Sequence, residues 1–313
     1  IANGSVEAAC NPLIAALYPD NKTTKLNQFH VWFPGGIVIG GLVGYLMGKL
    51  GLGWQAQFAT MLLPLAAYAV LFVGQSMPKT ERVEMGVSTG DMFAACLHPV
   101  FLLLVVCMLL TAATELGPNQ WIPNILENAG VSGLLVLVWI TGLMAVGRQF
   151  AGPFVHRLQP LGMLLGSAIL SAAGLFLMSQ TSGPMLFASA TVFAFGVCFF
   201  WPTMLGYTNE RFPKTGALGL AIMGGAGMLS ASYVLPVIGR WYDDGIAARI
   251  PEGVTAEALQ GAEAGSESAL QWATIQADAG LEAFGQVAYL PVGLAVIFLA
   301  LFIFSPKKAT PNH

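Results

Sequence analysis

A carboxylate, an amide and a proline lie close together in the first apolar stretch of the chain. Glu7, Asn11 and Pro12 share this stretch, and the first Lys or Arg in the sequence is Lys22. A charge inside a lipid bilayer is costly, so carboxylates in such positions usually face a pathway or bind a proton. Asn11 follows Glu7 by four residues, so both lie on one helix face and can bind hydroxyl groups together. Pro12 frees a backbone carbonyl one turn earlier, which is either a further acceptor or a kink.

His30, Trp32 and Trp201 are the next candidates, because each places a ring inside or beside an apolar run. His30 is either a protonatable gate or a histidine at the membrane interface, and Trp32 follows it by two residues. Trp201 precedes Pro202 and either stacks on a sugar ring or packs against other helices. Aromatic side chains suit both roles, so the alternatives stay open at this point.

A helix break is predicted around Pro118, where Glu115, Asn119, Gln120 and Trp121 lie close together. Broken helices near the outer end of a span often form gates in transporters. Glu115 is about 27 Å along its predicted helix, which is nearer the outer interface than the membrane centre. These residues therefore form an outer gate, with Gln120 and Trp121 as a platform for a sugar, or they form an interfacial cap.

A membrane fold must position these candidates, and the composition predicts one. Charged residues make up 9% of the 313, against about 25% in ordinary soluble domains. The sequence contains apolar runs of transmembrane length, roughly 17 to 25 residues. These runs are apolar on every face, which excludes the alternating strands of a barrel. The sequence therefore predicts an all-α, polytopic membrane helix bundle. The runs cover residues 1–18, 28–48, 56–76, 97–118, 133–155, 160–179, 184–207, 216–239 and 286–304.

Net charge and motifs exclude several other functions. The formal net charge is −3, which does not favour nucleic acid as a partner. The four cysteines have no metal-ligand spacing and are interpreted as free packing thiols. No nucleophile elbow, metal cluster or phosphate loop is present, so we expect no enzyme activity, no metal and no cofactor.

The basic residues predict the orientation of the helices. Ten of the 13 Lys and Arg fall on one side of the alternating loops, and the positive-inside rule makes that side cytoplasmic, together with the C-terminus. Glu7 then lies about 16 Å from the cytoplasmic end of its helix, near the middle of a hydrocarbon core about 30 Å thick. There it either couples protons to conformational change or packs as a hydrogen-bonded side chain. The ten are Lys22, Lys25, Lys79, Arg82, Arg148, Arg157, Arg211, Lys214, Lys307 and Lys308.

An internal repeat at an offset of 189 residues predicts two related halves. Tyr18 matches Tyr207, and Lys22 matches Arg211 at this offset. Repeated halves are typical of secondary transporters, whose site lies between them. Because the half that contains Glu7 needs three more helices, we expect the chain to be a fragment. The expected division is residues 1–77 for the second half of the N-terminal domain, 78–96 for a cytoplasmic linker and 97–313 for the C-terminal domain, with a long outer loop at 240–285.

Two six-helix halves, a cytoplasmic linker and basic cytoplasmic loops resemble the major facilitator superfamily, with helices four to twelve of twelve present. The residues from Glu7 to Pro12, followed by Leu26 and Asn27, look like the fourth and fifth helices of the fucose permease group of sugar:proton symporters. This resemblance implies that Glu7 takes part in proton coupling and sugar binding. In the usual family pattern an Asp stands where this chain has His156, so a charge relay at that loop is not implied.

The function predicted from the sequence is secondary active transport of a sugar or similar polar solute across the inner or cytoplasmic membrane. Alternating access and proton coupling are expected, and the protein is expected to act as a monomer in the lipid bilayer. One alternative is a facilitator or symporter for another polar solute, such as a nucleoside. Another is a receptor on the same scaffold that does not transport, with the acidic outer loop as its partner surface.

Overall fold

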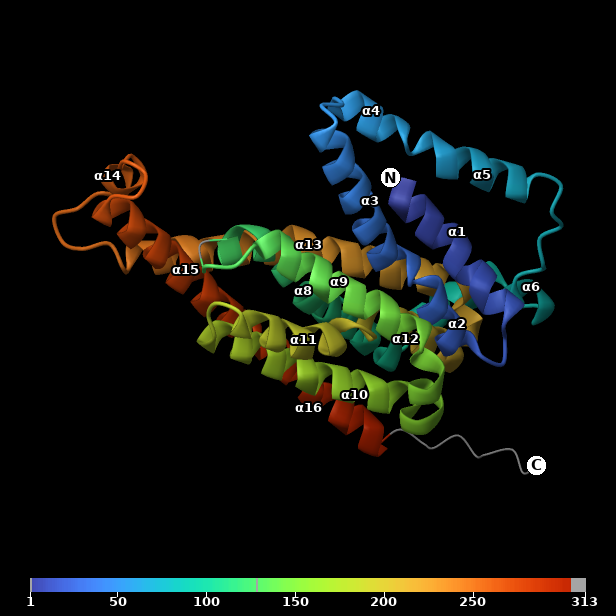
Figure 1. Cartoon of the computed structure of the whole chain (residues 1–313). Coiled ribbons are helices and arrows are strands. Elements are labelled where there is room, and N and C mark those ends of the chain that lie inside the picture. Colours follow the sequence, from blue (N-terminus) through green and yellow to red (C-terminus); the bar gives the residue numbers. More distant parts are fainter. Residues whose placement is uncertain (1, 128, 305–313) are drawn as a thin grey trace.

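The computed structural model describes residues 2–127 and 129–304, which fold into helices without any strand (Figure 1). The fold-class prediction is therefore confirmed. The elements are α1 (Ala2–Leu17), α2 (Lys22–Phe29), α3 (Trp32–Lys49), α4 (Trp54–Ala59), α5 (Leu62–Phe72), α6 (Glu81–Glu84), α7 (Thr89–Cys96), α8 (Pro99–Glu127), α9 (Gly133–Gln149), α10 (Ala151–Gln180), α11 (Met185–Val197), α12 (Phe200–Arg211), η1 (Pro213–Thr215), α13 (Gly216–Ala247), α14 (Ala256–Gln260), α15 (Glu267–Val287) and α16 (Tyr289–Phe304).

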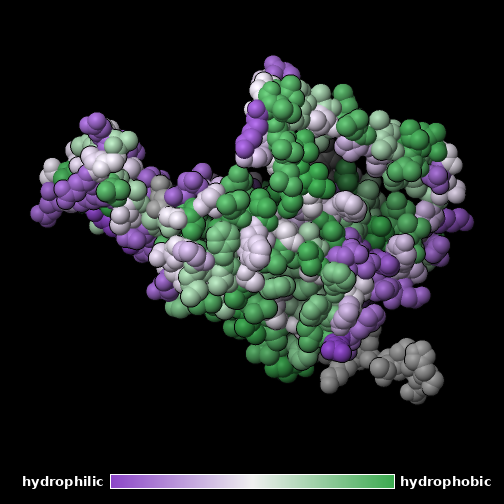
Figure 2. Space-filling model, viewed as in Figure 1, coloured by the Kyte–Doolittle hydropathy of each residue, from purple (hydrophilic) through white to green (hydrophobic). Residues whose placement is uncertain are grey.

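Seven helical segments in the described part of the chain are long and apolar enough to cross a membrane. Of the remaining predicted runs, 133–155 contains the shorter apolar helix α9, and 1–18 contains the 16-residue helix α1. Hydrophobic side chains cover the middle of the face seen in Figure 2, and hydrophilic side chains gather toward its two ends. This arrangement suits a protein whose middle faces lipid and whose ends face water.

The interior of the bundle is built from α8 to α13, α15 and α16, with α1, α2 and α3 packed against it (Figure 1). Helices α10 and α11 approach closely because a Cβ atom at Gly174 or Gly196 would collide with the facing backbone. By contrast, α4 and α5 have no buried residue and lie apart from the bundle. A groove of about 1080 Å³ lies between α1, α3 and this α4–α5 segment.

The predicted helix break at Pro118 is wrong, because α8 continues through Pro118 and Pro123 to Glu127. A proline inside a helix removes one backbone hydrogen bond, but here tertiary packing holds the helix together. Gly117 lies so close to α13 that a Cβ atom there would be 2.9 Å from Ile238 Cδ1. The close contact between α8 and α13 therefore outweighs the local tendency to break.

The region expected to be a long outer loop, 240–285, is mostly helical. Helix α13 continues past Pro236 to Ala247, and α15 begins after its N-cap residue Ser266. The two helices pack together where Gly245 faces Ala279, and Gly280 allows α15 to lie against Ile125 of α8. Helix α15 is thus part of the bundle and not of an outer loop.

The four cysteines are free in the structure, as expected. Cys96, Cys107 and Cys198 are buried, and Cys10 is partly buried. The described residues contain no cluster of His, Cys, Asp and Glu that is able to hold a metal ion.

Candidate functional site

Glu7 and Asn11 lie on one face of α1, as their spacing predicts. The Asn11 Nδ2 group donates a hydrogen bond of 2.6 Å to Glu7 Oε2. Asn11 is almost fully buried, whereas the Glu7 side chain is 18% exposed. The carboxylate is therefore bound by an amide on one side and open on the other.

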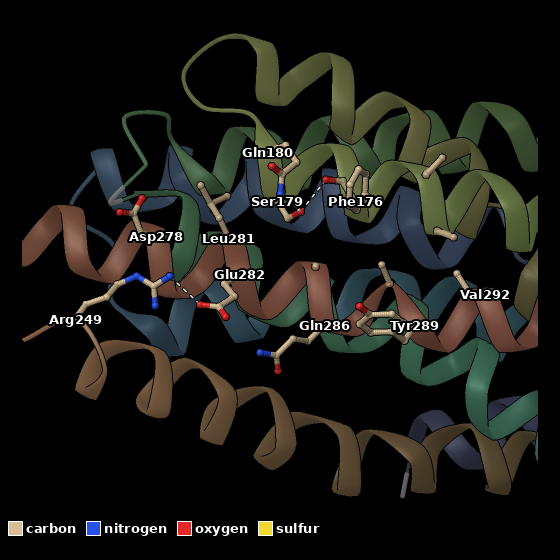
Figure 3. A pocket seen from close by; sticks show the side chains of 14 residues that line it. Phe176, Ser179, Gln180, Arg249, Asp278, Leu281, Glu282, Gln286, Tyr289 and Val292 are labelled. Carbon is tan, nitrogen blue, oxygen red and sulfur yellow. Dashed lines mark hydrogen bonds and ion pairs between the residues drawn. The ribbon is translucent and has the colours of Figure 1, made fainter.

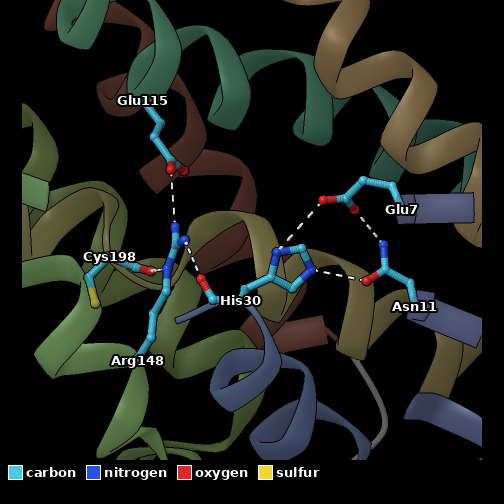
Figure 4. A network of polar contacts seen from close by, with 6 residues as sticks. All are labelled: Glu7, Asn11, His30, Glu115, Arg148 and Cys198. Carbon is cyan, nitrogen blue, oxygen red and sulfur yellow. Dashed lines mark hydrogen bonds and ion pairs between the residues drawn. The ribbon is translucent and has the colours of Figure 1, made fainter. Parts of the chain in front are cut away.

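His30 joins this pair from the turn between α2 and α3 (Figure 4). Its Nε2 atom lies 3.0 Å from Asn11 Oδ1, and its Nδ1 atom lies 3.9 Å from Glu7 Oε1. The ring is buried, so the interpretation of His30 as an interfacial histidine is wrong. The physical reason is that α2 is a short separate helix, and its C-terminal turn directs the ring toward α1 instead of the membrane surface.

A buried ion pair lies beside this group, between Arg148 of α9 and Glu115 of α8. Arg148 Nη2 is 3.0 Å from Glu115 Oε1, and both side chains are no more than 3% exposed. Arg148 also donates from Nε to the Cys198 carbonyl at 2.6 Å and from Nη1 to the His30 carbonyl at 3.2 Å. Figure 4 shows how these contacts join residues from α1, α8 and α9. Three acceptors thus hold one guanidinium group in a single orientation.

This ion pair corrects two predictions made from the sequence. Arg148 is buried in the last turn of α9, not in a cytoplasmic loop, because its guanidinium group points into the bundle and contacts the Cys198 carbonyl and Glu115. Glu115 lies near the middle of the 29-residue α8, not near its outer end. The glycine before Arg148 was the available sequence signal for a buried position. A Cβ atom at Gly147 would be 2.6 Å from Cys198 Sγ, so the close packing here needs glycine.

A cavity of about 20 Å³ connects the carboxylates of Glu7 and Glu115. Trp201 contributes its indole to the wall, and close approach of this ring to α13 requires the absence of a side chain at Gly227. Trp201 Nε1 and Glu115 Oε2 are buried and have no hydrogen-bond partner among the described residues. The wall is formed by Glu7, His30, Phe33, Glu115, Leu116, Arg148, Trp201 and Met228.

The structure separates Asn119, Gln120 and Trp121 from this site, whereas Trp32 lies at its edge. Trp32 is 72% exposed and lines the groove beside α3, together with Glu7 and His30. Gln120 is exposed, and Trp121 packs against Tyr242 with 5.8 Å between ring centroids. Asn119 Oδ1 is buried without a hydrogen-bond partner in the described part of the chain. Trp121 thus packs α8 against α13 beyond the polar cluster.

A second hollow, of about 820 Å³, lies between α10 and the α15–α16 segment (Figure 3). Arg249 and Glu282 form an ion pair of 2.8 Å at its edge, with Asp278 nearby. Both members of the pair are substantially exposed, and none of the candidates from the sequence lines this hollow. The interior cluster around Glu7 remains the candidate site.

Helix α2 is joined to α12 by a contact that the sequence did not reveal. Glu210 Oε1 accepts hydrogen bonds from Thr23 Oγ1 at 2.7 Å and from the Thr23 backbone N–H at 3.3 Å. The N-cap residue of α2, Asn21, makes no side-chain capping bond. A carboxylate from α12 therefore caps the positive end of α2.

We expect Glu210→Ala to lower the free energy of unfolding by about 1.5–3 kcal/mol, because hydrogen bonds to a charged group are lost. Thermal unfolding of the purified protein measures this change. Glu252→Ala is the matched control, since Glu252 is exposed in the loop before α14. Equal stability of the two variants would exclude Glu210 as a cap of α2.

Comparison with known proteins gives one finding. The model of the family described as Major Facilitator Superfamily matches residues 1–242, which include every residue of the polar cluster. No curated protein matches the chain.

Proposed function

The chain belongs to the major facilitator superfamily and is a secondary transporter embedded in a membrane by several helices; we propose that its solute is a sugar or a similar polar molecule and that transport is coupled to protons. The observation that supports this proposal is the cluster of Glu7, Asn11 and His30 next to the Arg148–Glu115 pair. Buried polar groups are costly in an apolar bundle, so they usually serve a function.

The chemistry of the cluster favours a neutral polar solute. Glu115 compensates the charge of Arg148, which leaves Glu7 as the one acid of the cluster without a cation. Glu115 Oε2 supplies a free acceptor, and Trp201 Nε1 supplies a donor beside the Glu7 carboxylate. A polyol offers hydroxyl groups that both donate and accept, and its ring face suits an indole.

The cavity of about 20 Å³ holds roughly one water molecule and no sugar. Binding of a solute between Glu7 and Glu115 thus requires α8 and α12 to move relative to α1 and α3. We propose that the helices of residues 1–77 and those of residues 97–313 rock against each other and expose the site alternately. Such motion agrees with alternating access between repeated halves.

The proposed orientation places the basic turns and the C-terminus in the cytoplasm of a cell with this protein in its inner or cytoplasmic membrane. The turn between α1 and α2, the α6–α7 segment and the end of α12 lie at one end of the molecule (Figure 1), and their Lys and Arg residues favour the cytoplasm. Helix α14 lies at the opposite end. We propose that a monomer is sufficient for transport, since both groups of helices belong to one chain.

Uptake into proteoliposomes tests the solute and the coupling together. The intact protein is supplied with radiolabelled fucose, galactose or uridine, with and without an imposed proton gradient. We expect uptake of a sugar that increases strongly when the gradient is present. Uptake of uridine alone would indicate a nucleoside transporter, and sugar uptake that ignores the gradient would exclude symport.

A further inference from the structure

We infer that Glu7 and His30 share a single proton, held between Glu7 Oε1 and His30 Nδ1, and that Asn11 positions the imidazole to receive it. This inference rests on the proposed proton coupling and extends it to a second residue. The sequence left His30 as a protonatable gate or a histidine at the membrane interface, and the geometry adds Glu7 as its partner.

The amide of Asn11 determines which nitrogen of His30 carries hydrogen. Asn11 Nδ2 lies 2.6 Å from Glu7 Oε2, and the amide donates there because a carboxylate oxygen accepts. The opposite end of the amide, Oδ1, therefore faces His30 Nε2 at 3.0 Å. Oδ1 accepts only, so His30 Nε2 must donate and carries the hydrogen of the neutral ring.

The other ring nitrogen is then an acceptor that faces a second acceptor. A neutral imidazole with hydrogen on Nε2 has a lone pair on Nδ1. This atom is 3.9 Å from Glu7 Oε1, which is longer than a hydrogen bond. Figure 4 joins the two atoms by a dashed line. One proton added between them converts the gap into a charge-assisted or neutral hydrogen bond of about 2.7–2.9 Å.

The surrounding charges limit the pair to one proton. Arg148 donates to the His30 backbone carbonyl at 3.2 Å, so its positive charge opposes a second proton on the ring. Glu115 is paired with Arg148, and Cys10 is the neighbouring thiol, three residues after Glu7 on α1. A proton taken from hydronium breaks one O–H bond there and leaves a water molecule. It forms one N–H or O–H bond in the Glu7–His30 pair, whose net charge changes from −1 to 0.

A neutral pair is cheaper to enclose than an ionised one in an apolar bundle. Closing the helices around the site therefore favours the protonated pair, and opening it to water allows the proton to leave through the exposed side of Glu7. The proton is held where the carboxylate is 18% exposed and the ring only 4%. This difference gives the proton one exit, past the carboxylate.

Isotope-edited infrared spectroscopy of the intact protein, titrated without solute, tests the inference. The band lost in Glu7→Gln identifies the Glu7 carboxyl group. In the wild-type protein we expect this band and the His30 ring bands to change at one common pH midpoint. In His30→Gln we expect the midpoint of the Glu7 band to move by at least about one pH unit, as for coupled groups. His156→Gln is the matched control, since His156 is exposed, and should leave the midpoint unchanged.

An unchanged Glu7 midpoint in folded His30→Gln protein would overturn the inference. Where that variant does not fold, nitrogen NMR of histidine-labelled wild-type protein provides the second test. We expect the Nε2–H tautomer for His30 at alkaline pH, and the Nδ1–H tautomer would contradict the arrangement. If Glu7 and His30 titrate together in a protein whose solute uptake does not depend on the proton gradient, the inference about the pair stands. Only the proposed function is then refuted.

Discussion

Glu7→Gln is expected to abolish uphill accumulation of solute while exchange of solute across the membrane continues. Glutamine keeps the size of the side chain and an oxygen that accepts from Asn11 Nδ2, but it does not bind a proton at physiological pH. Without proton binding, a proton gradient no longer biases the direction of transport. Radiolabelled uptake into proteoliposomes, with and without the gradient, measures accumulation, and counterflow with internal unlabelled solute measures exchange.

The control for this variant is Glu252→Gln, an exposed carboxylate outside the bundle that should leave both activities unchanged. In Glu7→Gln the internal solute concentration should rise only to the external one. Undiminished accumulation would show that Glu7 does not carry the coupled proton. Loss of both accumulation and exchange would instead assign Glu7 to solute binding or folding.

Breaking the ion pair between Arg148 and Glu115 is expected to cost more stability than any surface substitution. Removal of one member of a buried pair leaves an uncompensated charge, which costs about 3–5 kcal/mol. Both Arg148→Met and Glu115→Gln should therefore strongly destabilise the protein in thermal or denaturant unfolding. The double variant should be more stable than either single one, because no lone charge remains.

The exposed pair of Arg249 and Glu282 is the matched control for this experiment. Exposed pairs contribute about 0–1 kcal/mol, so Arg249→Met and Glu282→Gln should change stability little. Additive losses for Arg148→Met and Glu115→Gln would contradict the account of a coupled buried pair. Losses no larger than those of the exposed pair would show that the buried charges are compensated elsewhere.

The sequence predicts the helices well because their apolar runs are local signals. The pairing of Glu7 with Asn11 is equally local, since a spacing of four residues determines which helix face they share. Helix ends were harder to predict. Pro118 and Pro236 favour a break by local rules, yet packing between α8, α13 and α15 continues the helices past both residues.

The central site was only partly predictable for a related reason. Arg148 counts as a cytoplasmic residue when charges are assigned to loops, and only its contacts with Glu115 and the Cys198 carbonyl show that it lies inside. His30 reaches Asn11 across 19 residues of chain, through a turn that no local pattern predicts. Residues that meet across different helices require the tertiary structure, whereas residues on one helix do not.

Proton movement that accompanies solute entry is the most direct test of coupling through Glu7. Proteoliposomes that contain the intact protein and a pH-sensitive dye receive external fucose or galactose with no imposed gradient. We expect the interior to acidify as the sugar enters, and to stay at constant pH in Glu7→Gln liposomes while exchange continues. Sugar entry into wild-type liposomes without any acidification would contradict proton-coupled transport.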